Sequence, residues 1–118
     1  MRFHDIFSKG VEEVNRRMSY DSQIQNALLR YNGRKVVINV TDDATYLFTI
    51  SSNGITYSHS PSSIPDDMYV ETDSEIMNEL IQGGIDAIRA MVLYATGRIK
   101  TKRIGVKEIN LIRKLLGR

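Results

Sequence analysis

The sequence predicts an α+β fold, because helical and strand periodicities occupy separate parts of the chain. Apolar residues recur at every third or fourth position before residue 32 and alternate over most of residues 34–72, and helical spacing then returns around one short strand. The 118 residues, 42% hydrophobic and 25% charged, suffice for one core of ordinary composition. We therefore expect a single domain over residues 1–118.

Two amphipathic helices are expected at the start of the chain. The apolar stripe of the first runs from Phe3 to Met18, with charged side chains at the positions between. The second begins after Asp21, whose carboxylate can cap free backbone amides, and ends at the sequence NGR, residues 32–34.

Four strands follow the two helices. Segments 34–40, 45–51 and 55–59 alternate between apolar and polar residues, and the short turn sequences between them predict an antiparallel meander. Residues 60–67 contain both prolines and predict a loop, which leads into a fourth strand at 68–72.

The last part of the chain alternates helices with one strand. Thr72 and Glu75 have the spacing of a capping box, which predicts a helix that begins at once and ends at Gly83 and Gly84. A further helix, a strand and a last helix are expected over residues 86–95, 98–103 and 104–116. The resulting element order is ααββββααβα.

The segment 85–96 is apolar except for one charge of each sign. Ile88, Met91, Val92 and Ala95 share one face of the expected helix, and we expect this face to cover the sheet and, in part, to line a binding site. The uncharged run Ala90–Gly97 is much shorter than the roughly 20 apolar residues that cross a bilayer.

Catalytic and metal-binding residues are scarce in the sequence. No cysteine is present, and His4 and His59 lie on different elements without the context of a base or a metal ligand. Neither a phosphate-binding glycine motif nor a cofactor motif occurs. The acidic pairs in the turns are interpreted as turn formers that bond to local backbone: Asp42–Asp43 and Asp66–Asp67. We expect neither an enzyme nor a bound metal or cofactor.

The expected location is the cytoplasm. The N-terminal sequence lacks the apolar core and cleavage site of an export signal, and the C-terminal residues LLGR are not a peroxisomal address. The absence of cysteine fits a reducing compartment.

The charges are distributed unevenly along the chain. Residues 1–84 carry 7 basic and 12 acidic side chains, whereas residues 85–118 carry 9 and 2. The basic third indicates either an ordinary solvated face or a surface for nucleic acid, an acidic protein or an anionic membrane. No aromatic residue interleaves with the cations of 98–103, which makes single-stranded nucleic acid an unfavoured partner.

Several long strings of the sequence resemble one known family. They are YNGRKVVINVTDDATYLFTI with NGITYSHS, then YVETDSEIMNELIQGGIDAIRAM, and TGRIKTKRIGVKEINLIRKLL. Together with the element order, these strings resemble the sterol carrier protein family of non-specific lipid carriers, in its short stand-alone prokaryotic form. The glycine, basic, apolar, basic signature of that family corresponds to Gly97, Arg98, Ile99 and Lys100.

The resemblance implies a five-stranded, largely antiparallel sheet with about five helices across one face and an apolar tunnel between the layers. A fatty acyl chain or another amphiphilic lipid would occupy the tunnel, and this sequence favours no particular ligand and no oligomeric state. The candidate lining residues are Phe48, Ile50, Met68, Val70, Met77, Leu80, Ile88, Met91, Val92, Ile99, Ile109, Ile112 and Leu116.

A lipid carrier must also meet a membrane to load and unload. The candidate residues for docking on an anionic surface are Arg98, Lys100, Lys102 and Arg103. The alternative function is a protein or nucleic-acid interaction module that acts through the same basic third of the chain.

Overall fold

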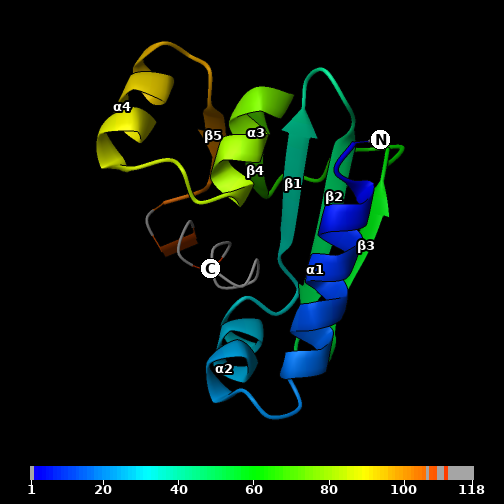
Figure 1. Cartoon of the computed structure of the whole chain (residues 1–118). Coiled ribbons are helices and arrows are strands. Elements are labelled where there is room, and N and C mark those ends of the chain that lie inside the picture. Colours follow the sequence, from blue (N-terminus) through cyan, green and yellow to red (C-terminus); the bar gives the residue numbers. More distant parts are fainter. Residues whose placement is uncertain (1, 106, 109–110, 112–118) are drawn as a thin grey trace.

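The computed structural model describes residues 2–105, 107–108 and 111 (Figure 1). Its elements are α1 (His4–Arg17), α2 (Ser22–Arg30), β1 (Lys35–Val40), β2 (Thr45–Ser51), β3 (Gly54–His59), β4 (Met68–Thr72), α3 (Ser74–Ile81), α4 (Ala87–Ala95) and β5 (Lys100–Lys102). Their order agrees with the prediction as far as the fifth strand. Most of the expected last helix, residues 104–116, lies outside the described residues.

The five strands form one mixed sheet in the order β3-β2-β1-β4-β5. Neighbouring strands are antiparallel except β1 and β4, in which Val36 stands beside Met68 and Val40 beside Thr72. This one parallel pair arises because residues 60–67 carry the chain from the β3 edge back past β2 and β1 before β4 begins. The predicted five-stranded, largely antiparallel sheet is therefore confirmed.

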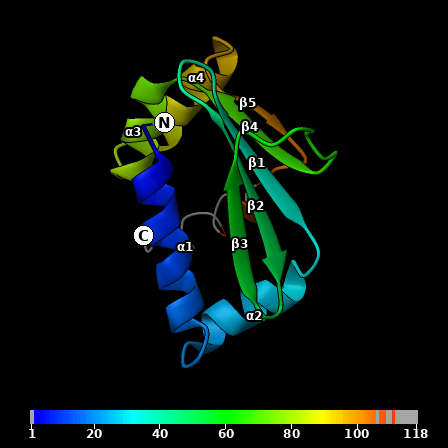
Figure 2. The ribbon, with the colours of Figure 1, turned by 90° about the vertical axis from the view of Figure 1, so that its right-hand side faces the viewer.

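Helices α1 and α3 lie on the same face of the sheet, and α2 lies beneath the end at which β2 turns into β3 (Figure 2). The strands direct alternate side chains toward this face, and those of β1 are Val36, Ile38 and Val40, all buried. Helix α4 stands farther out, beside α3 and β5 (Figure 1). Within the described residues, no helix has both the length and the apolar character needed to cross a membrane.

The caps of the helices are mostly short acidic side chains. As predicted, the Asp21 carboxylate begins α2 by accepting hydrogen bonds from the backbone N–H groups of Gln23 and Ile24, at 3.0 and 3.3 Å. The predicted cap of α3 is wrong by one residue. Asp73 caps α3, because Thr72 is a buried strand residue whose hydroxyl donates to the carbonyl of Arg98 at 3.0 Å.

The acidic pair in the first turn connects distant segments, which corrects its interpretation as a purely local turn former. Asp42 accepts hydrogen bonds from both the backbone and the hydroxyl of Ser74, at 2.8 and 2.7 Å. Asp43 accepts from the backbone N–H of Arg2 at 2.7 Å and from the buried Tyr46 hydroxyl. These bonds fasten the start of α1 and the start of α3 to the same turn.

The second acidic pair is also more than a local turn former. Asp67 does bond locally, because its carboxylate accepts from the backbone N–H of Met68 at 2.9 Å. It also accepts from the guanidinium of Arg34 at 2.6 Å and the backbone N–H of Lys35 at 2.9 Å. Asp67 therefore joins the long loop to the start of β1 and sets the register of β4 beside it.

Candidate functional site

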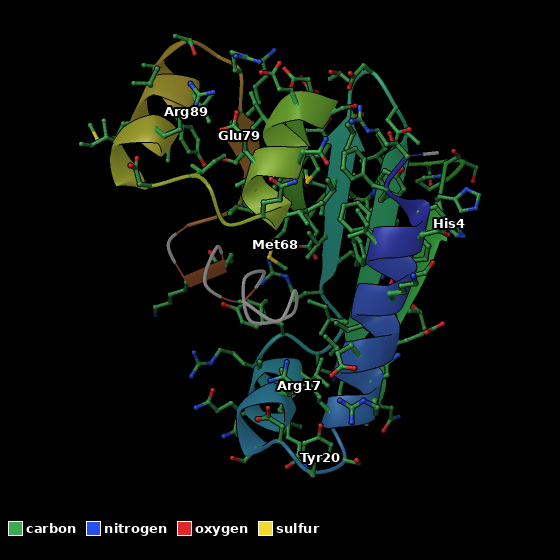
Figure 3. The ribbon with its side chains drawn as sticks, in the orientation of Figure 1. His4, Arg17, Tyr20, Met68, Glu79 and Arg89 are labelled. Carbon is green, nitrogen blue, oxygen red and sulfur yellow. The ribbon has the colours of Figure 1, made fainter. Side chains whose placement is uncertain are left out.

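The largest apolar cluster lies between the sheet and the helices that cover it. Its buried members include three predicted lining residues: Ile50 of β2, Met68 of β4 and Met77 of α3. Phe48 and Leu80 are half-buried and pack against the same cluster. Five of the predicted lining residues therefore belong to one helix–sheet interface, and Met68, which Figure 3 labels, is fully buried in it.

Aromatic rings form one end of this interface. Phe7 of α1 contacts Tyr46 and Phe48 of β2 edge to face, with ring centroids 4.8 and 5.4 Å apart. Phe3 stacks on Phe7 at 5.9 Å. Phe3 immediately precedes α1 and lies four residues before Phe7, so both rings can project from the same side of the start of the helix.

Burial and hydrogen bonding perturb the titrating groups beside the rings. Burial raises the pKa of Tyr46 far above its usual value, and the hydrogen bond to Asp43 adds to this effect. Although burial raises the pKa of Asp43, hydrogen bonds from Arg2 and Tyr46 lower it overall. The buried Tyr46 hydroxyl is therefore held in its neutral form and donates a hydrogen bond to Asp43.

A second, smaller cluster adjoins the first on the side of α4. It contains Ile76, Ile85, Leu93 and the predicted lining residue Ile99, all buried. Leu80 packs against both clusters, so it lies where the two meet. The remaining predicted residue of β4, Val70, is half-buried and stands between Ile38 and Thr101 in the sheet.

The prediction that Ile88, Met91, Val92 and Ala95 of α4 face the sheet is wrong. Ile88, Met91 and Val92 are 75%, 71% and 48% exposed, and Ala95 is also exposed. Leu93 is instead the buried residue, at 1% exposure. The physical reason is that the helix is apolar on both sides, so periodicity alone could not decide which side packs against the body.

Three predicted lining residues, Ile109, Ile112 and Leu116, lie outside the described residues. Leu111, which the sequence did not single out, is described and is buried in the first cluster.

The four predicted docking cations lie along β5 and beside it, and each is paired with a carboxylate. The pairs are Arg98 with Asp73 at 3.0 Å, Lys100 with Glu71 at 3.7 Å, Lys102 with Asp66 at 2.7 Å and Arg103 with Asp66 at 2.9 Å. Arg98 also lies 3.9 Å from Glu75, so four cations face four carboxylates. The hydrogen bond from Lys102 lowers the pKa of Asp66, as do the nearby positive charges. This edge is therefore close to neutral, unlike the basic strip that the sequence predicted.

The structure brings together two histidines that the sequence analysis treated separately. His4 Nδ1 lies 2.9 Å from the Tyr57 hydroxyl, and the rings of His4 and His59 are 5.1 Å apart (Figure 3 labels His4). The pairing of β2 with β3 sets Tyr46 opposite His59, but His4 comes from α1, and no local sequence pattern indicated that it lies beside them. Within the part of the chain that the structure describes, no three metal-ligating side chains converge.

No known family model matches this chain, and no curated protein matches it. Solved structures do match its fold. The structure titled UbiJ-SCP2 Ubiquinone synthesis protein is 12% identical and superposes with a TM-score of 0.61 over 91% of this chain and 89% of that chain. Sterol Carrier Protein 2 from Yarrowia lipolytica, in the apo form, is 19% identical, with a TM-score of 0.55 over 88% of this chain and 84% of its own. The chain has the sterol carrier protein fold.

The sterol carrier protein fold also occurs inside a larger protein. The sec-alkylsulfatase Pisa1 from Pseudomonas sp. is 13% identical, with a TM-score of 0.56 over 79% of this chain but only 14% of that chain. Because all these identities are low, the likeness establishes architecture, and any function has to be argued from the residues of this chain.

Proposed function

We propose that this chain is a small lipid-binding or lipid-carrier protein that holds a fatty acyl chain or another amphiphile between its helices and its sheet. The observation that carries the proposal is the convergence of five predicted lining residues at one apolar interface within a sterol carrier protein fold. The names of two similar structures, a sterol carrier protein and a ubiquinone synthesis protein, refer to lipid-like molecules.

The proposed binding site centres on Phe48, Ile50, Met68, Met77 and Leu80. Ile99 extends it toward the second cluster, and the half-buried Val70 and the undescribed Ile109, Ile112 and Leu116 remain part of the proposal. Burial of one methylene group contributes about 0.8 kcal/mol, so a chain of roughly 16 carbons would supply on the order of 10 kcal/mol before the costs of binding. Apolar contact alone would therefore suffice for affinity.

Methionine supports an adaptable site. Met68 and Met77 are both buried in the first cluster, on the sheet side and on the helix side. An unbranched thioether changes rotamer at little cost and fills gaps of different shape, so two buried methionines at this interface can repack around different acyl chains.

The proposed activity is non-enzymatic, in the cytoplasm as expected above, and needs no cofactor. The carboxylates described here act in caps, ion pairs and links between segments. A carrier requires no general base or nucleophile, so the proposal is compatible with carboxylates that serve structural purposes.

The proposal is tested by titration with a fluorescent fatty acid. Leu80→Trp places a large ring where the two apolar clusters meet, and we expect it to lower the affinity at least about tenfold. Leu29→Trp is the matched control, because Leu29 is 64% exposed on α2. Circular dichroism would verify that both variants fold.

Two results would contradict the proposed site. One is the absence of saturable binding by the wild-type chain. The other is equal affinity of the folded Leu80→Trp variant and the wild type, which would place the ligand elsewhere.

A further inference from the structure

Among the residues that the structure describes, none covers the apolar stripe on the outer face of α4. Ile88, Met91, Val92 and Ala95 follow the spacing i, i+3, i+4 and i+7, so they lie along one side of the helix. All four are exposed. Figures 1 and 3 show α4 at the margin of the molecule, farther from the sheet than α3.

Contacts on the opposite side hold α4 in this orientation. Leu93 is buried in the second cluster, and the guanidinium of Arg89 lies 3.2 Å from the Glu79 carboxylate of α3. Figure 3 labels both residues of this pair. Asp86 caps the first turn through the backbone N–H of Arg89 at 2.7 Å. The helix is thus fixed with its stripe outward, and turning the stripe inward would expose Leu93.

The size of the stripe decides between two kinds of occupant. A helix of nine residues is about 14 Å long and roughly 10 Å wide, so one of its faces offers only a few hundred Å². A stable protein–protein interface buries about 800 Å² on each partner. A second copy of this chain would therefore bury too little surface through the stripe, whereas a lipid surface sets no such minimum.

The charges around the stripe fit an apolar environment. The only charged residue of α4 is Arg89, which is paired with Glu79, and the neighbouring cations of β5 are paired as well. Tyr94, which is 44% exposed at the end of the helix, donates to the Thr101 hydroxyl at 3.2 Å. An aromatic ring with a polar tip at the border of an apolar surface is typical of residues at a membrane interface.

We infer that α4 inserts its outer face into the interfacial layer of a lipid bilayer, including a bilayer without net charge. A helix lying in the interface buries its apolar side about 5–10 Å deep, which matches a single helix width. The inference rests on the proposed function in one respect, since it identifies where a lipid carrier would load and unload. In this inference the chain binds membranes by inserting apolar side chains, whereas the sequence had suggested attraction between cations and anionic lipid.

Binding to vesicles of pure phosphatidylcholine tests the inference. Met91→Asp places a charge at the centre of the stripe, and we expect it to lower partitioning at least about tenfold. Leu29→Asp, at a comparably exposed site on α2, serves as the matched control and should bind as the wild type does. Raising the salt concentration should not weaken binding of the wild type.

A fluorescent reporter tests the same inference independently of any effect on folding. The chain contains no tryptophan, so Met91→Trp introduces a single one on the stripe. We expect its emission to shift to shorter wavelength when vesicles are added, and that of Leu29→Trp to stay unchanged.

Three results would overturn the inference: unchanged Met91→Trp emission, equal vesicle binding by wild type and Met91→Asp, or a wild-type dimer that Met91→Asp dissociates in sedimentation experiments. Titration of the wild type with fatty acid in the absence of vesicles tests the proposed function separately. Failure of one proposal can therefore be distinguished from failure of the other.

Discussion

At the scale of single residues, Asp67 shows how one carboxylate can position a strand. Its side chain is largely buried, at 16% exposure, and accepts hydrogen bonds from Arg34, Lys35 and Met68. The bond from the Arg34 guanidinium is the first cause that lowers the pKa of Asp67, and burial opposes it. The ionised form is therefore the one that the folded chain stabilises.

We expect Asp67→Asn to lower the free energy of unfolding by about 2 kcal/mol at neutral pH, because it weakens charged hydrogen bonds near the start of β1. Since the pKa of Asp67 is lowered on folding, its contribution is present above about pH 4 and is lost as the pH falls through the folded-state pKa. Urea unfolding at pH 7 and pH 3 would measure both effects. The difference in the free energy of unfolding between wild type and variant should be smaller at pH 3 than at pH 7. An equal difference at both pH values would refute this role of Asp67.

The caps of α2 and α3 differ in how well local sequence predicts them. Asp21 could be assigned to α2 because it directly precedes a clear apolar stripe. For α3, the capping-box spacing selected Thr72, whereas Asp73 is the cap, because the preceding strand runs through Thr72. Thr72 belongs to the strand because the parallel pairing with β1 extends to Val40, a contact between distant segments that local spacing does not reveal.

At the scale of elements, α4 is the helix whose position the sequence predicted and whose orientation it did not. Its bounds agree closely with the expected residues 86–95. Four apolar residues indicated one face, but the body packs against the opposite face through Leu93. A helix with an apolar residue on every side carries no marker of which side is buried.

A pair of substitutions distinguishes the two faces of α4. We expect Leu93→Ala to lower the free energy of unfolding by about 3 kcal/mol, because it removes a fully buried side chain. Met91→Ala, on the exposed face, should change it by no more than about 0.5 kcal/mol. Urea unfolding would measure both variants, and the reverse order of effects would show that the helix is rotated relative to our description.

The strand β5 and its neighbours illustrate how ion pairs conceal a basic segment. Asp66 pairs with both Lys102 and Arg103, so Asp66→Asn would release two cations at the surface. We expect this variant to bind anionic vesicles roughly thirtyfold more tightly than the wild type at low salt, since two released cations near such a surface contribute about 1 kcal/mol each. The gain should disappear at high salt. Unchanged affinity at low salt would mean that this edge does not face the membrane.

At the scale of the whole molecule, the alternation of the strands and the order of elements predicted the architecture well. The hairpins of β1, β2 and β3 follow from short turns, and the structure pairs them as expected. The parallel pairing of β1 with β4 could not be read from local pattern, because the loop 60–67 has no periodicity that indicates its destination. Similarly, the meeting of five lining residues depends on contacts across the sheet, although each residue had been predicted singly.

The central claim is that the apolar interface between helices and sheet holds one amphiphile. Native mass spectrometry of the purified chain, followed by extraction and identification of lipids, tests this claim most directly. Our account predicts a complex of one amphiphile per chain, or, if the chain is purified empty, saturable uptake of added hexadecanoic acid. A bare chain mass, no lipid in the extract and no saturable uptake would together contradict it.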